Sequence, residues 1–398
     1  MFMGNLWKEN TPTDFWCCQT DPPAEETWRI CVTEALSSQG MLGRIDDVED
    51  FLQLTLGEGQ FGPAHWDIGR TLNLYYRVKP FLPRVLINYL KKLNHIKQNN
   101  NFLLGWPFEE RYVCYLWDCI HRVLIHSNRS STPFRYFWPA GYRFAFVLTH
   151  DVETSKGQDF VRAVTDLEEE MGFRSSFNFV PEGYKLDLNL IQELRDRGFE
   201  VGVHGLYHDG NLFSSHKIFI ERARRINFHL KELGSVGFRS PLTHRNPEWM
   251  QELDIEYDLS FFDTDPYEPM PGGCMNIWPY KIGRFIELPY TLAQDSTLRS
   301  LGEKSPRLWM DKLVFILSYN GMALLNSHPD YLKEKTLWDM YIEFLGAVSS
   351  RGDYWNALPQ QVARWWRVRT GDLPPSSDME IETGVVSLDG DHIQITYG

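Results

Sequence analysis

Two acidic residues, Asp151 and Glu153, follow a short apolar run at 144–148 and are separated by a single residue. In an extended chain alternate side chains point to the same side, so both carboxylates would share one wall. Like charges that close favour a cation between them, or one carboxyl group whose raised pKa suits a general base. Two solvated acids in a loop would give the same pattern, so the pair alone carries little weight.

Two histidines, His204 and His208, stand at the end of another apolar run and lie four residues apart. At this spacing one helical turn would direct both imidazoles at the same ion. Two histidines and one carboxylate leave coordination positions open for water and substrate, as in catalytic metal sites. The alternative is one exposed histidine and one packed histidine, and the spacing alone does not separate the two interpretations.

Two further apolar runs end in Arg239, within G-F-R-S-P, and in His328, within S-H-P. The Arg239 guanidinium could hold a catalytic carboxylate ionised because it pairs bidentately with carboxylates, although a surface arginine beside a turn is the alternative. His328 could protonate a leaving amine because the ordinary pKa of histidine lies near neutral pH. Polar residues of complementary roles at four run ends make coincidence the weaker explanation.

These residues need a fold that brings several strand ends together. From about residue 140 onward, short apolar runs alternate with helical patterns, which is typical of parallel strands buried on both faces. We therefore predict a barrel-like α/β domain, in which chemistry gathers at the C-terminal ends of the strands. The predicted strands are 144–148, 175–180, 199–203, 235–238, 285–289 and 322–326, and the predicted helices are 159–171, 190–197 and 217–233.

The first 130 residues show a different pattern. Apolar residues recur at helical spacing at 45–56 and at 85–93, so we predict a mainly helical accessory region at 1–130. The segment at 126–141 is rich in Ser, Pro and Gly and is predicted to connect this region to a catalytic domain at 140–370. For the tail at 371–398 we expect short β structure.

Composition narrows the classes of partner. With 43% hydrophobic and 23% charged residues the chain is typical of globular proteins, and its net charge of -13 argues against nucleic-acid binding. Its apolar stretches are far shorter than the roughly 20 residues that cross a membrane. The N-terminus lacks a secretory signal and the six cysteines form no C-x-x-C pair, so we expect a cytoplasmic protein with reduced thiols. The oligomeric state does not follow from the sequence.

Together the four motifs, T-H-D-V-E, H-x-x-x-H, R-S-P and S-H-P, resemble those of the polysaccharide deacetylases, carbohydrate esterase family 4. This family includes the rhizobial nodulation chitooligosaccharide deacetylase. The resemblance covers roughly residues 140–370 and implies a distorted (β/α)7-type barrel with a mainly helical N-terminal extension. Residues 1–130 have no counterpart in the family's core, and the segment at 353–366 resembles its closing helix.

The resemblance also implies a role for each motif residue. Asp151 is expected to be the catalytic base, and Glu153, His204 and His208 the metal ligands, with Glu153 standing where Asp is commoner. Arg239 would brace the base and His328 would be the acid. The fourth motif resembles either 257–265 or 287–291, and Asp263 is the acid we name as the residue that would tune His328.

The implied activity is metal-dependent removal of N-acetyl groups from an N-acetylated sugar, in polysaccharide or glycan biosynthesis. Asp151 would take a proton from metal-activated water as it attacks the acetamide carbonyl, and His328 would protonate the departing amine. We expect Zn²⁺ as the cofactor, although Co²⁺, Ni²⁺ or Fe²⁺ could use the same ligands.

Several alternatives stay open at this stage. The same residues could hydrolyse another linear or cyclic C–N bond, in an amide or ureide, or the domain could be a catalytically inactive carbohydrate-binding domain. An open groove favours a glycan and a closed small pocket favours the small amides. A further hypothesis places the prolines and lysines at Pro80, Pro83, Lys91 and Lys92 on a membrane that carries a lipid-linked glycan.

Overall fold

A computed structural model describes residues 5–19, 21–38, 47–69, 102–375 and 380–397. Strand β2 (Phe144–Val152) lies within a nine-stranded, mainly parallel sheet. One edge of β2 pairs with β9, and the other pairs first with β10 and then with β3. Beyond β3 the sheet continues through β4, β5, β6, β8 and the antiparallel β7. The bounds are β3 (Ser176–Phe179), β4 (Glu200–His204), β5 (Gly237–Arg239), β6 (Tyr257–Asp258), β7 (Tyr280–Ile282), β8 (Phe285–Glu287), β9 (Met322–Ser327) and β10 (Tyr354–Asn356).

The sheet curls toward a barrel. The segment after β8 returns to β9, where Leu292 and Leu325 form a parallel bridge and the amide of Thr291 donates to the carbonyl of Leu324. All nine residues of β2 are buried, as expected for a parallel strand that is covered on both faces. Each buried Phe, Val or Leu side chain of such a strand contributes roughly 1.5–3 kcal/mol.

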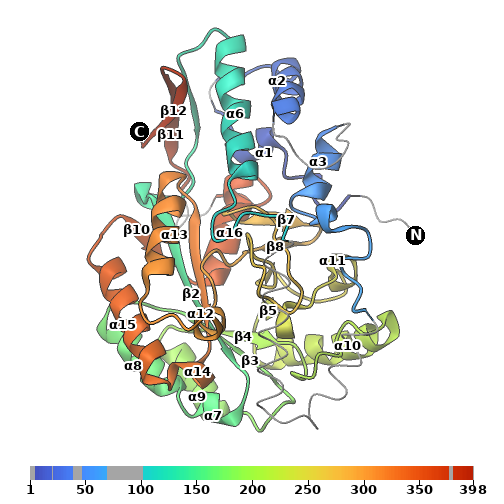
Figure 1. Cartoon of the computed structure of the whole chain (residues 1–398), viewed down its shortest axis with the longest axis vertical. Coiled ribbons are helices and arrows are strands. Elements are labelled where there is room, and N and C mark those ends of the chain that lie inside the picture. The colour runs from blue at the N-terminus through green and yellow to red at the C-terminus, as the bar shows by residue number, and fades with distance from the viewer. Residues whose placement is uncertain (1–4, 20, 39–46, 70–101, 376–379, 398) are drawn as a thin grey trace.

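Helices follow most of the strands and cover the outside of the sheet (Figure 1). The short helices α7 and α14, which follow β2 and β9, contact each other at the lower end of Figure 1. The helices of this part are α7 (Ser155–Gln158), α8 (Val161–Glu170), α9 (Leu188–Asp196), α10 (His216–Glu232), α11 (Pro247–Met250), α12 (Asp295–Leu301), α13 (Arg307–Ser318), α14 (Pro329–Leu332), α15 (Lys335–Ser349) and α16 (Pro359–Thr370).

The predicted α/β barrel-like fold is confirmed. Each of the six predicted strands coincides with a strand of the sheet, and the three predicted helices correspond to α8, α9 and α10. The sequence pattern missed β6, β7 and β10, which have two or three residues and do not stand within a longer apolar run.

The N-terminal part contains several helices among its described residues. It contains α1 (Pro12–Trp16), α2 (Glu25–Ser38), α3 (Val48–Leu54) and α6 (Arg111–His126), and α2 packs against α6. The predicted helix at 45–56 corresponds to α3. The predicted helix at 85–93, with Pro80, Pro83, Lys91 and Lys92, lies outside the described residues. None of the helices in the described ranges is long and apolar enough to cross a membrane.

A small second sheet lies beside α6, near the top of Figure 1. Strand β1 (Ser131–Arg135) pairs antiparallel with β11 (Thr383–Asp389), which pairs in turn with β12 (His392–Tyr397). The tail therefore contains the expected short β structure. The segment at 126–141, predicted as a connection, instead includes β1, because its Thr132 and Phe134 alternate inward and are buried under the tail.

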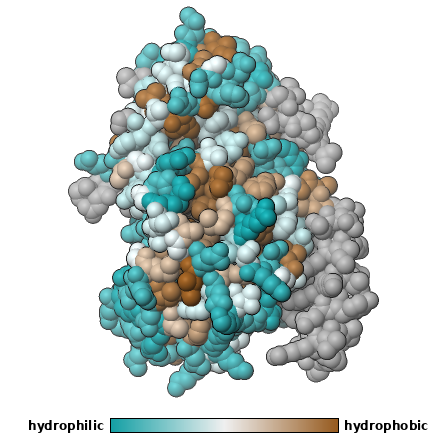
Figure 2. All heavy atoms as spheres, turned by 60° about the vertical axis from the view of Figure 1, so that its left-hand side comes forward, coloured by the Kyte–Doolittle hydropathy of each residue, from teal (hydrophilic) through white to brown (hydrophobic). Residues whose placement is uncertain are grey.

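The surface carries separate groups of apolar side chains. On the face shown in Figure 2 these groups are interrupted by hydrophilic residues. Among the exposed large apolar residues are Ile125, Val314 and Ile342. Scattered residues of this kind are normal on a protein surface and mark no interface by themselves.

A fully buried ion pair joins the N-terminal part to the barrel. The Glu58 carboxylate accepts hydrogen bonds from Arg245 at 2.6–3.0 Å and from the amide of Gly273. The Arg245 guanidinium also lies 5.2 Å from the ring centre of Trp66 and 4.6 Å from that of Phe262. Both charged groups are fully buried, so the free energy of burying each charge is offset only if the other stays in place.

The acid sensitivity of the fold should reveal this pair. Burial raises the pKa of Glu58, but Arg245 and His65 outweigh burial and lower the pKa to about 2. The lowered pKa means that the pair stabilises the folded state above about pH 4.5 and that this contribution is lost as the pH falls toward 2.

We predict that Glu58→Gln destabilises the protein by roughly 3–5 kcal/mol at pH 7, because it leaves the Arg245 charge buried and unpaired. Urea denaturation monitored by fluorescence measures the change. The matched control is Asp339→Asn, which removes an exposed partner of Lys335 and should change stability by less than about 0.5 kcal/mol. Equal stability of Glu58→Gln and wild type would contradict the prediction.

Candidate active site

The polar residues that the sequence singled out come together at the C-terminal ends of β2, β4, β5 and β9. Asp151 and Glu153 lie on the same side of β2, as the period of two predicts. His150 points to the other side, where its ring nitrogens lie 2.9 Å from Ser327 Oγ and 2.7 Å from Glu168 Oε1.

Glu153, His204 and His208 form a group whose ligand atoms all lie within 4.8 Å of one another. His208 Nε2 is 3.1 Å from Glu153 Oε1. His204 Nδ1 is 3.2 Å from the carbonyl oxygen of Arg239, which leaves Nε2 of this buried ring without a hydrogen-bond partner among the described residues. A buried nitrogen lone pair beside a second imidazole and a carboxylate is the donor set of a catalytic divalent-metal site. The three residues therefore fit a metal.

The two histidines reach this position by a loop and not by the helical turn that the spacing predicted. His204 is the last residue of β4, and Gly205 turns the chain with a φ of +63°. A Cβ atom at Gly205 would lie 2.3 Å from the Pro241 ring, so a glycine is required on steric as well as conformational grounds. The prediction failed because the left-handed conformation of Gly205 is incompatible with a helical turn at 204–208.

Both oxygens of the buried Asp151 carboxylate accept a hydrogen bond from an amide. Asn178 Nδ2 donates to Oδ1 at 3.1 Å, and Asn326 Nδ2 donates to Oδ2 at 2.9 Å. Burial raises the pKa of Asp151, but His204, Arg239 and His328 together with Asn326 lower it below the ordinary value. Asp151 is therefore ionised at neutral pH. The sequence contains a signal for Asn178, which stands between Phe177 and Phe179, and for Asn326, the first polar residue after the apolar run at 322–325.

Arg239 lies against Asp151 without the bidentate pairing that the sequence predicted. Its Nε is 3.4 Å from Asp151 Oδ1, which is an ion pair, while Nη2 donates to Thr149 Oγ1 at 3.0 Å. The guanidinium of Arg239, at the end of the short strand β5, lies beside Thr149, two residues before Asp151 on β2. Only one of its nitrogens therefore approaches the Asp151 carboxylate.

Asp295, and not the predicted Asp263, contacts His328. Asp295 Oδ1 lies 2.6 Å from His328 Nδ1, and Oδ2 accepts the backbone amide of His328 at 2.8 Å. Burial lowers the pKa of His328, but Asp295, Glu153 and Asp151 raise it to about 10. The imidazole is consequently protonated at neutral pH, with Nε2 3.8 Å from Glu153 Oε1.

Asp263 instead forms a buried ion pair with Lys312 of α13, at 2.5 Å. The same ammonium group donates to the carbonyl of Pro107 in the N-terminal part. Burial raises the pKa of Asp263 to about 6 although Lys312 lowers it. Asp263, the acid that we named for His328, is thus paired with Lys312, and Lys312 links it to the N-terminal part.

Two residues that follow His328 hold Glu153. Tyr331 donates from its hydroxyl to Glu153 Oε2 at 3.3 Å, and Asp330 Oδ2 accepts the Glu153 amide at 3.0 Å. Burial raises the pKa of Glu153, but His208 outweighs burial and lowers it well below the ordinary range. The sequence analysis missed both residues, because an acid and a tyrosine after S-H-P are not distinctive.

The pKa values of the two imidazoles in the Glu153, His204 and His208 group are shifted in opposite directions. Burial lowers the pKa of His204 to about 4, so this ring is neutral at neutral pH and has a lone pair to donate. Burial also lowers the pKa of His208, but the carboxylate of Glu153 reverses the effect and raises it. Binding of a metal requires the neutral form of each imidazole, so the raised pKa of His208 opposes binding of the ion as the pH falls.

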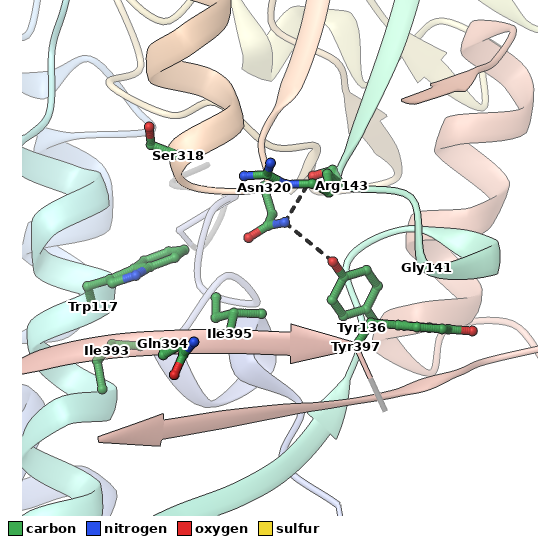
Figure 3. A pocket seen from close by; sticks show the side chains of 10 residues that line it. All are labelled: Trp117, Tyr136, Gly141, Arg143, Ser318, Asn320, Ile393, Gln394, Ile395 and Tyr397. Atoms are coloured by element: carbon green, nitrogen blue, oxygen red, sulfur yellow. Dashed lines mark hydrogen bonds between the residues drawn. The ribbon is translucent and has the colours of Figure 1, made fainter. Parts of the chain in front are cut away.

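A cavity of about 380 Å³ lies at the other end of the barrel, between α6, β12 and the turn after α13 (Figure 3). Trp117 and Ile395 form part of its wall, and Asn320 Nδ2 donates to the hydroxyl of Tyr136 at 3.4 Å. This cavity contains none of the residues that the sequence singled out for chemistry.

Comparison with known proteins gives matches among solved structures. A protein from Mycobacterium smegmatis assigned as a polysaccharide deacetylase aligns over 61% of this chain and 96% of its own, with 20% identity and a TM-score of 0.48. A second, from Pseudomonas aeruginosa PAO1, has the same coverages and TM-score with 16% identity. Solved polysaccharide deacetylases are thus similar to this chain.

The similar structures also include a Puue allantoinase, with 14% identity and a TM-score of 0.48 over 59% of this chain and 93% of its own. No family model and no curated protein matches the sequence.

The contact between His328 and Asp295 predicts a change in the titration of the histidine. We expect Asp295→Asn to lower the pKa of His328 from about 10 toward the ordinary value, because it removes the main charge that stabilises the imidazolium. Nuclear magnetic resonance of the ring in metal-free protein measures this pKa. Asp263→Asn is the control and should leave it unchanged, so a drop in the control with none in Asp295→Asn would reverse our assignment.

Proposed function

We propose that this protein is a metal-dependent hydrolase that removes acetyl groups from an N-acetylated sugar. The observation that carries the proposal is that three groups of side chains lie together at one end of the barrel. These are an ionised acid clamped by two amides, a protonated histidine paired with an acid, and a Glu/His/His group that fits a divalent metal. Hydrolysis of an acetamide needs such a base, such an acid and a means to polarise the carbonyl.

Glu153, His204 and His208 are the proposed metal ligands. A divalent ion held there would act as a Lewis acid that polarises the acetamide oxygen and lowers the pKa of water. The nitrogen and oxygen donors favour Zn²⁺, and Co²⁺, Ni²⁺ or Fe²⁺ could use the same set.

Asp151 is the proposed base. Its carboxylate is ionised and held in place by Asn178 and Asn326, so it can take the proton of a water molecule as that water adds to the carbonyl carbon. Arg239 contributes positive charge beside the carboxylate and is a positioning residue in this scheme.

His328 is the proposed acid. Asp295 occupies the Nδ1 side of the ring and fixes its orientation, so the proton on Nε2 faces the site. As the C–N bond breaks, this proton passes to the departing amine, and the products are acetate and a free amino sugar. The sugar part of the proposal depends on the resemblance of the four motifs to polysaccharide deacetylases.

Metal content and acetate release test the proposal together. We expect about one divalent ion per chain and release of acetate from N-acetylglucosamine oligomers, and we expect His204→Ala/His208→Ala to lose both. His216→Ala changes a histidine at the start of α10, outside the ligand group, and should retain both. Metal binding with acetate released only from other acetamides or from cyclic ureides would keep the hydrolase and change its substrate. Absence of metal after reconstitution would refute the proposal.

Substitutions of the proposed base and acid should reduce turnover without reducing metal binding. We predict that Asp151→Asn and His328→Ala each lower kcat by roughly 10²–10⁴-fold while the protein keeps its metal and its circular dichroism spectrum. The reason is that each variant removes a proton-transfer group without removing a metal ligand. Asp339→Asn, an exposed substitution, serves as the control. Wild-type turnover in either active-site variant would contradict the assigned roles.

A further inference from the structure

A chain of buried polar side chains extends away from Asp151. Asn326 Nδ2 donates both to Asp151 Oδ2 and to Gln294 Oε1, each at 2.9 Å. Gln294 Nε2 then donates to Glu268 Oε1 at 2.7 Å. All four side chains are at most 5% exposed, so water does not compete for these hydrogen bonds. Two amides therefore connect two carboxylates.

The direction of this chain is determined at its two carboxylate ends. A side-chain amide can turn by 180° with little steric change, but the turn exchanges its acceptor for its donors. Both carboxyl oxygens of Glu268 act as acceptors, one for Thr243 Oγ1 and the other for Gln294, so Glu268 takes the NH₂ group of Gln294. The oxygen of Gln294 then faces Asn326, and only the NH₂ group of Asn326 can satisfy both Gln294 and Asp151.

The reversed arrangement would disturb the base. If the amide of Asn326 turned over, its oxygen would face the Asp151 carboxylate and the two acceptors would repel each other. Its present orientation also leaves Asn326 Oδ1 as the acceptor for Thr149 Oγ1 at 3.2 Å, and Thr149 in turn accepts from Arg239. The orientation of Asn326 thus affects Thr149 and, through Thr149, Arg239, which lies beside Asp151.

Glu268 also contacts the turn that follows β5. Its second oxygen accepts a hydrogen bond from Thr243 Oγ1 at 2.9 Å. Thr243 and Leu242 both have positive φ, +52° and +60°, which is strained for residues with a side chain. Glu268 is therefore held between this strained turn after β5 and the amide chain.

We propose that Glu268 is a positioning residue for the base: through Gln294 it fixes the amide of Asn326 so that Asn326 donates to Asp151. The inference rests on the proposed function in so far as Asp151 is the base, whereas the hydrogen-bond direction itself is a property of the fold. Glu268 does not touch the reacting atoms in this scheme.

A pair of isosteric variants tests the proposal. In Glu268→Gln the new amide can offer either an oxygen or an NH₂ group, so Gln294 loses its fixed direction. In Glu268→Gln/Gln294→Glu the carboxylate moves to position 294, where it again accepts from Asn326 and from the residue at 268. Glu303→Gln, an exposed substitution of the same type, is the matched control.

The first readout is kinetic and uses acetate release at pH 8. We expect Glu268→Gln to lower kcat roughly tenfold with KM changed less than about twofold, since one oriented hydrogen bond is lost in the transition state. The double variant should recover most of the lost kcat, and Glu303→Gln should match wild type. A double variant as slow as Glu268→Gln would overturn the proposal, because a mere packing defect is not repaired by a second substitution.

The second readout does not need activity. In protein labelled with ¹⁵N at asparagine and glutamine, the side-chain NH₂ of Asn326, assigned by comparison with Asn326→Asp, should exchange slowly with solvent. We expect Glu268→Gln to speed this exchange at least tenfold and the double variant to slow it again. Unchanged exchange in Glu268→Gln would overturn the proposal even if the wild type released no acetate, an outcome that would separately refute the proposed function.

Discussion

The register of β2 is the constraint on which the site depends. Its side chains alternate between the two faces, so a slip of one residue would replace Asp151 and Glu153 with His150 and Val152 at the site. Pairing with β3 and β9 on opposite edges fixes the register. On the far face His150 is held between Glu168 and Ser327, and a slip would leave these buried polar groups without their partner. The position of the two acids is thus determined from both faces of the strand.

Burial of so many charges requires that each has a partner. Glu153 lies against His208, His328 against Asp295, and Asp151 against Arg239 with two amides. Desolvation of these groups is costly, so their mutual attraction must offset it for the barrel to fold. Charges that are already paired and fixed are also the preorganised dipoles that stabilise a charged transition state. The network that the fold needs for stability is therefore the one that the proposed chemistry needs.

The sequence predicted six strands of the sheet and singled out six motif residues that the structure brings together, because their signals are local. An apolar run and the polar residue that ends it are neighbours in the chain. Asp295 was not predicted because its contact with His328 spans 33 residues and arises only when α12 docks beside β9. Asp263 failed for the same reason, since Lys312, 49 residues away, pairs with it. The turn at Gly205 shows that even a local spacing misleads where a left-handed residue reverses the chain.

The N-terminal part, which has no counterpart in the motifs, pairs with residues beside the turn that follows β5. Glu58 holds Arg245, two residues after Thr243, and Lys312 joins Pro107 to Asp263. The turn at Leu242 and Thr243 is strained, and strained backbone persists only where its surroundings hold it in place. Glu268 accepts a hydrogen bond from Thr243 Oγ1, and Arg245, which pairs with Glu58, donates to the carbonyl of Thr243 at 2.8 Å. The N-terminal residue Glu58 is therefore connected through Arg245 to the turn after β5, although it lies almost a hundred residues before Asp151 in the chain.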